Sequence, residues 1–214
     1  MIAARGERGV ALVITIMALL LMSALGAGLV LTSTSETIIA SNFRNGIEGR
    51  YAADAVISRA IDDLAAIGDW TLVIDGSLRS AWVDGPPSGL RTLSDGSTID
   101  LAQAVNLANC QKSSPCSPAE LAAVTADRPW GENNPRWTPY AHRPLSDLRA
   151  PSATIDSPYY VLLLAGNGPV APLLALRAEA FGPRGAHAVI ELTAGYNDDP
   201  GQGAVKILSW REVR

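Results

Sequence analysis

Several residue types are scarce in this chain of 214 residues, and each scarcity excludes something. Lysine occurs only at Lys112 and Lys206, and acidic residues outnumber basic ones by 21 to 17, giving a formal net charge of -4. A general nucleic-acid-binding protein carries a basic excess instead. The nucleophile elbow GxSxG, the metalloprotease motif HExxH and the Walker A motif are all missing. The sequence therefore predicts no nucleic-acid partner, no catalytic residues and no cofactor.

Cysteine is limited to two residues, Cys110 and Cys116, which lie close together in CQKSSPC. The CxxC spacing of zinc sites is missing, and neither His142 nor His187 is near in the sequence, so a metal site is disfavoured. In an exported protein this pair predicts a disulfide that closes a short loop, whereas in the cytosol the two would stay thiols.

Charge is absent from Val10 to Leu31, and this run of 22 residues has a length that spans a bilayer as a helix. Arg5 and Arg8 precede the run, and the next basic residue is Arg44, which predicts a cytoplasmic amino terminus and an external remainder. An ordinary secretory signal has a shorter apolar core of about 7–15 residues, followed by its cleavage site. A membrane anchor is therefore favoured over an ordinary cleaved signal.

Proline is absent before Pro86, although the chain contains 14 prolines, and this absence favours one long helix over residues 10–67. Beyond the apolar run, two rows of apolar residues recur with helical spacing. We expect both rows to pack on an external domain, with Gly68 as the helix stop. The first row is Ile39, Phe43, Ile47, Tyr51 and Ala55, and the second is Val56, Ile57, Ala60, Ile61 and Leu64.

The remainder, residues 68–214, predicts an external globular head of the α+β class. Residues 70–85 alternate between apolar and polar, which favours short strands, and residues 86–158 are rich in turn formers. Ser117, Pro118 and Glu120 form a helix-start pattern within this loop-rich middle. Four apolar runs then predict an antiparallel meander: Tyr159–Gly166, Leu173–Gly182, Ala186–Tyr196 and Gly203–Trp210.

Three groups of side chains are candidates for binding sites, and each also has a structural interpretation. Asn197, Asp198 and Asp199 offer oxygens for calcium, but the ion needs six to eight ligands, which favours a solvated turn. His187 and Glu191 lie in one predicted strand, and Glu179 lies in the predicted strand before it. Side chains that face one another on a sheet are usually structural, so a structural role is favoured. The third group interleaves arginines with aromatic rings that would stack nucleobases or else fix a loop to the domain: Arg128, Trp130, Arg136, Trp137, Tyr140 and Arg143.

The amino-terminal segment resembles that of the PilX-type minor pilins of type IV pilus systems. The resemblance rests on a basic leader that ends at Gly9, the apolar helix, the step Thr32–Ser35 with Glu36, the segment Ala40–Arg44 and the patch Ala52–Ala55. It implies a pilin-like fold in which a long helix packs on a carboxy-terminal antiparallel sheet.

The same resemblance implies that a prepilin peptidase cuts between Gly9 and Val10, so that residues 1–9 are a leader and residues 10–31 remain as the transmembrane segment. It further implies methylation of the processed chain, a single-pass position in the inner membrane with a periplasmic head, and possible transfer to a pilus tip with a part in cell adhesion. The implied partners are other minor pilins, the major pilin and the inner-membrane assembly machinery.

One residue departs from the pattern of the major pilins, which carry glutamate as the fifth residue of the processed chain. This chain has Ile14 there. Because that carboxylate pairs with a buried amino terminus, its loss disfavours a repeating shaft subunit. The resemblance then implies a minor pilin that primes or caps assembly. A type II secretion pseudopilin, or a single-pass membrane protein that binds a ligand without any filament role, stays open as an alternative.

Overall fold

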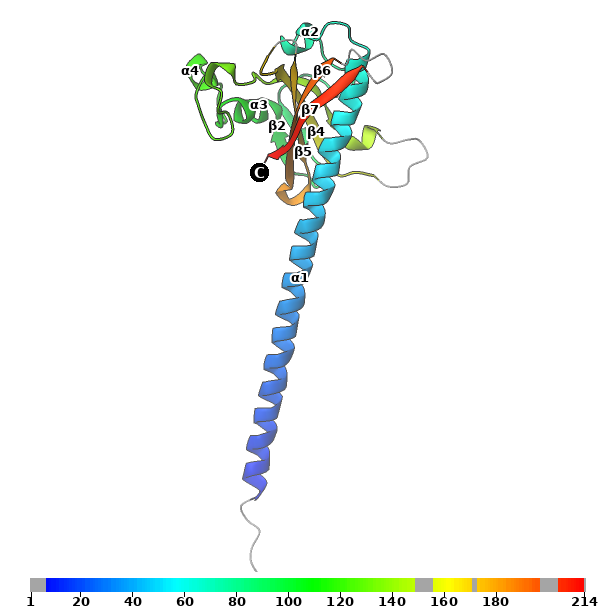
Figure 1. The fold of residues 1–214 in the computed structure, drawn as a ribbon. Coiled ribbons are helices and arrows are strands. Elements are labelled where there is room, and N and C mark those ends of the chain that lie inside the picture. The colour runs from blue at the N-terminus through cyan, green and yellow to red at the C-terminus, as the bar shows by residue number, and fades with distance from the viewer. Residues whose placement is uncertain (1–6, 149–155, 171–172, 197–203, 214) are drawn as a thin grey trace, which may run out of the picture. The chain divides into compact units, whose positions relative to one another are not determined.

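A computed structural model describes residues 7–148, 156–170, 173–196 and 204–213 (Figure 1). The chain divides into two compact units, residues 1–44 and residues 45–214. Helix α1 (Glu7–Ala65) begins in the first unit and ends in the second. The long helix expected for residues 10–67 is thus present.

The first unit is the proline-free, mainly apolar part of α1. The helix continues through Gly26 and Gly28, so these glycines do not unwind it. Five hydroxyl groups donate to the backbone carbonyl four residues earlier, which satisfies them within the helix itself and removes their need for water. The donors are Thr15, Thr32, Thr34, Ser35 and Thr37.

The second unit is built on a five-stranded antiparallel sheet in the order β3-β4-β5-β6-β7. Its strands are β3 (Thr138–Pro144), β4 (Tyr160–Asn167), β5 (Leu174–Phe181), β6 (His187–Tyr196) and β7 (Val205–Val213). The last four are the predicted meander, and the α+β pilin-like fold is confirmed. Between β5 and β6, Arg184 (φ 58°) and Gly185 (φ 73°) take the left-handed conformation that the turn requires.

Each face of the sheet has its own core. Strand β4 is buried on both faces, with Val161, Leu163 and Ala165 toward α1 and Leu162 and Leu164 toward the other side. The second face is covered by α3 (Leu101–Cys110), whose apolar side chains Leu101, Ala104 and Ala108 are buried there. Asp100 caps α3 by accepting from the backbone N–H groups of Ala102 and Gln103.

Short elements make up the rest of the second unit. They are α2 (Thr71–Ile74), β1 (Leu90–Thr92), β2 (Thr98–Asp100), α4 (Pro118–Leu121), η1 (Gly131–Asn133), η2 (Leu145–Leu148) and η3 (Pro183–Gly185). The capping box predicted from Ser117 and Glu120 is formed at α4. The strands expected in residues 70–85 are wrong: α2 begins there, and residue 83 forms only an isolated bridge to His142.

One of the two apolar rows on α1 is buried and the other is not. Val56, Ala60 and Leu64 of the second row lie in the core against the sheet. The expectation that the first row also packs on the domain is wrong within the second unit, because Ile47 is 40% exposed and Tyr51 is 70% exposed. The buried face instead takes in Ala52 and Ala53, whose small side chains permit close packing.

Tyr159 fixes the start of the packed part of α1. Its hydroxyl donates to the carbonyl of Asn45 over 2.6 Å. Its ring lies 3.1 Å from the position that a Cβ on Gly49 would take, and a Cβ on Gly182 would clash with the same ring. Gly49 therefore allows the close approach of helix and sheet, and Gly182 leaves room for the Tyr159 ring.

Candidate functional site

The apolar part of α1 is the most unusual surface of the chain. From Gly9 the helix is long and apolar enough to cross a membrane, with a mean hydropathy of 2.5 in its best window and none of that window buried. Leu12, Leu20 and Leu29 are all more than 60% exposed. Apolar side chains of this number are not left in water by a stable fold. The helix fits a single-pass membrane anchor.

The predicted processing junction lies in the first turns of α1. Val10 is 60% exposed, and in the described part of the chain no atom lies within 4 Å of the position that a Cβ on Gly9 would take. Ile14, one turn further on, is 61% exposed. The junction is thus open on all sides that the structure describes.

Residues 8–57 match the family model described as PilX N-terminal. The chain begins with a PilX N-terminal segment. Searches of curated proteins and of solved structures each returned no match to the chain. The resemblance inferred from the sequence is confirmed over this segment.

The PilX N-terminal segment takes in the apolar part of α1 and the beginning of its packed part. Its last residue, Ile57, is buried against the sheet, as are Ala53 and Val56. Pilins of this type are structural proteins, and the match supports a role related to type IV pili and their components. Residues 58–214, which include the whole sheet, lie outside the match.

The two cysteines lie at the end of α3. Cys110 and Cys116 are joined by a disulfide, with their Cα atoms 6.0 Å apart. The loop between them leads into α4, where Lys112 and Glu120 form an ion pair over 2.5 Å. The disulfide thus closes the loop that carries the polypeptide from α3 to α4.

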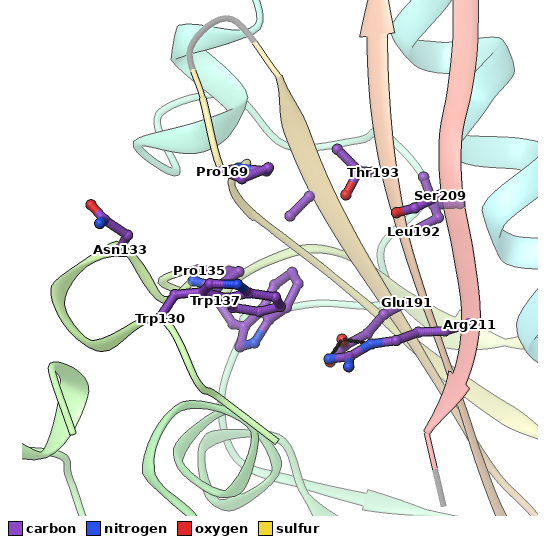
Figure 2. A pocket seen from close by; sticks show the side chains of 11 residues that line it. Trp130, Asn133, Pro135, Trp137, Pro169, Glu191, Leu192, Thr193, Ser209 and Arg211 are labelled. Atoms are coloured by element: carbon purple, nitrogen blue, oxygen red, sulfur yellow. Dashed lines mark hydrogen bonds and ion pairs between the residues drawn. The ribbon is translucent and has the colours of Figure 1, made fainter. Parts of the chain in front are cut away.

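The interleaved arginine and aromatic residues do not form one surface. Tyr140 and Arg128 are buried, and the Arg128 guanidinium donates to the carbonyls of Ala108 and Leu121. Trp137 is 5% exposed, which fixes its loop to the domain, but Trp130 is 51% exposed. Both tryptophans line a cavity of about 370 Å³ on the face of the sheet that α3 covers (Figure 2).

His187 belongs to a network of charges on this same face. Its Nε2 lies 3.0 Å from Oε2 of Glu179, and its ring stacks on Phe181. Arg177 bonds to both Glu179 and Glu191 over 2.6 Å. Burial alone would raise the pKa of Glu179, but the bond from His187 and the charge of Arg177 outweigh it and lower that pKa. These partners support a structural role for His187.

A second polar cluster could not be found from the sequence, because its members are 58 and 76 residues apart. Asp84 accepts from Nδ1 of His142 over 3.0 Å, from the Tyr160 hydroxyl over 2.9 Å and from Arg91 over 3.1 Å. Nε2 of His142 is buried without a partner in the described structure. A proton added there would have no acceptor, so the neutral ring is favoured.

This cluster predicts that acid destabilises the head. Burial lowers the pKa of His142 from 6.5, and the bond to Asp84 only partly offsets it. The pKa of Asp84 lies below 3.8, because its three donors outweigh the effect of burial. Each folded-state pKa is below the unfolded value, so stability is full above about pH 6.5 and falls as each group is protonated.

Urea unfolding of the full chain in detergent micelles, followed by tryptophan fluorescence at a series of pH values, measures this effect. In a His142→Gln variant the free energy of unfolding should change less with pH between about pH 5 and 7, even if the substitution lowers stability at every pH. Leu90→Gln, at a residue 69% exposed, is the control for a substitution that removes no titrating group. An unchanged slope in His142→Gln would contradict the assignment.

No group of three or more His, Cys, Asp or Glu side chains suited to a metal is present in the residues described. The calcium candidates Asn197, Asp198 and Asp199 lie outside those residues.

Proposed function

We propose that the chain is a minor pilin, cleaved after Gly9 and inserted in the inner membrane with its head in the periplasm. From there it enters a type IV pilus, where the head primes or caps assembly. The role is structural, without catalysis. The observation that carries the proposal is the PilX N-terminal match at residues 8–57, which coincides with a single exposed apolar helix followed by a packed domain.

Two further features support the details. Arg5 and Arg8 precede the apolar run, which favours a cytoplasmic amino terminus. Ile14 stands where a shaft subunit carries a carboxylate, so the processed chain has no partner there for a buried amine. A rare position at the end of a filament avoids the need to repeat that unpaired amine along the shaft.

Deletion of the gene tests the proposal. We expect surface pili to be lost or strongly reduced, and twitching to fall with them, when shear fractions and electron micrographs are compared with the parent strain. Expression of the intact gene from a plasmid should restore both. Normal pilus numbers with undiminished twitching would overturn the proposal, and a loss of protein secretion instead would assign the chain to a type II secretion pseudopilus.

A further inference from the structure

The two edges of the sheet differ. The edge strand β3 is covered by the segment 80–84, in which the backbone N–H of Ser80 donates to Tyr140 and that of Asp84 donates to His142. At the other edge, the backbone partners of β7 among the described residues all lie in β6. Residues 206–212 of β7 are all exposed. An uncovered edge of this kind presents N–H and C=O groups to another chain.

A hollow lies on each face of the sheet beside the same stretch of β7. On the α3 side is the cavity of about 370 Å³, with Trp130 and Trp137 on one wall and Ser209 and Arg211 on the other (Figure 2). On the α1 side is a hollow of about 260 Å³ lined by α1 and by Trp210. Its walls include the apolar side chains of Ile47 and Tyr51, which belong to the exposed row of the helix.

The position of the two hollows matches the geometry of an added strand. Residues 209 and 211 face one hollow, and residue 210 faces the other. Successive side chains of a strand paired to Ser209–Val213 would alternate between the two faces in the same way. Backbone bonds then give affinity, and pockets for alternate side chains give specificity. The pairing of β7 with β6 shifts its register between residues 207 and 209, so the regular part of the edge begins at residue 209.

We propose that the edge Ser209–Val213 of β7 binds an extended segment of a different polypeptide as a sixth strand, with uncharged apolar or aromatic side chains at every second position in the hollow on the α3 side. The charged residues at the walls of that hollow are paired within the head, since Arg211 bonds to Glu191 over 2.5 Å. The hollow on the α1 side differs, because Arg50 and Asp54 both line it. In the hollow on the α3 side a charged occupant would lose hydration without a partner, so an uncharged one is complementary.

A second copy of the chain fits this edge poorly. Antiparallel pairing of β7 with itself has its two-fold axis perpendicular to the sheet, so the second copy would turn its Ser209 and Arg211 toward the hollow on the α3 side. Arg211 is charged and does not suit a hollow that favours an uncharged occupant. Parallel pairing would set Arg211 near Arg211 and Glu212 near Glu212, and like charges across a strand pair are destabilising. The inference does not depend on a filament role.

The test uses the full chain in lipid nanodiscs and a phage-displayed library of random twelve-residue peptides. We expect the selected peptides to share apolar residues at every second position. Their affinity should fall at least about tenfold in Thr193→Trp, which fills the cavity on the α3 side, and in Trp210→Ala, which removes a wall of the other hollow. N-methylation of alternate peptide amides should have a similar effect. Leu90→Lys, at a residue 69% exposed in β1, is the matched control and should bind normally.

Three results would overturn the proposal. The first is a selection that yields no peptides with this period, and the second is equal binding to Thr193→Trp, Trp210→Ala and the control. The third is efficient cross-linking of a Ser209→Cys variant into a homodimer in the nanodisc, since it would assign the edge to a second copy. Circular dichroism of each variant, compared with the parent chain, separates loss of binding from loss of fold.

Discussion

In cells that make a prepilin peptidase, the membrane form of the chain should lack the mass of Met1–Gly9 and carry that of the methyl group added after cleavage. The structure describes Gly9 in the first turns of an exposed helix, so the junction is open to an enzyme. A substitution such as Gly9→Leu places a branched side chain beside the scissile bond. We expect it to abolish cleavage, so that intact-mass spectrometry finds only the full-length chain and surface pili are lost as in the deletion.

Gly28→Leu is the matched control for this experiment. In the described residues no atom lies within 4 Å of the position of a Cβ on Gly28, as at Gly9, and both replacements exchange a helical glycine for leucine. The control should still be processed in full. Retention of Met1–Gly9 in the parent chain would instead show a simple membrane anchor, and the minor-pilin proposal would then fail.

The second large effect is expected at Val56, which is fully buried between α1 and the sheet. Val56→Asp places a carboxyl in this core, where nothing can pair with its charge. The free energy of unfolding should fall by about 3–5 kcal/mol, enough to unfold a domain of ordinary stability. Urea unfolding in detergent micelles measures the loss, and limited proteolysis should show cleavage within the sheet.

Tyr51→Asp is the paired variant, because Tyr51 lies on the same helix but is 70% exposed. Its effect on stability should stay within about 0.5 kcal/mol. Equal destabilisation by the two substitutions would contradict the division of α1 into a buried face and an exposed one. The comparison is informative because the spacing of apolar residues alone assigned both positions to the packed side.

The incorrect assignment of Tyr51 to the packed side of α1 shows what the sequence can predict and what it cannot. Helical spacing identifies rows of apolar residues, but it does not state which row meets the sheet. Small residues decide which face of the helix packs: Gly49, Ala52 and Ala53 allow close contact with the sheet, whereas the larger Tyr51 is exposed. The membrane segment and the four carboxy-terminal strands could be predicted because their apolar runs are long and their turns are marked by proline and glycine.

Other parts of the structure depend on contacts between distant residues. Helix α3 follows directly on β2 without a loop, and β3 contains Pro139 and Pro144, so both were assigned to a loop-rich region. Proline is tolerated in β3 because it is an edge strand, which a single sequence does not reveal. The cluster of Asp84, His142 and Tyr160 likewise exists only once β3 and β4 are paired.

The contact of Tyr159 with α1 determines how the head would respond to mechanical load. Tension carried along the helix from the first unit enters the second at residue 45, where the Tyr159 hydroxyl holds the Asn45 carbonyl and its ring lies against Gly49. This contact therefore bears the load before Val56 or Leu64 does. If it yields, the buried residues Ala52, Ala53 and Val56 are the next along the helix to take the load. Tyr159 is therefore the first residue outside α1 to resist a pull on the helix.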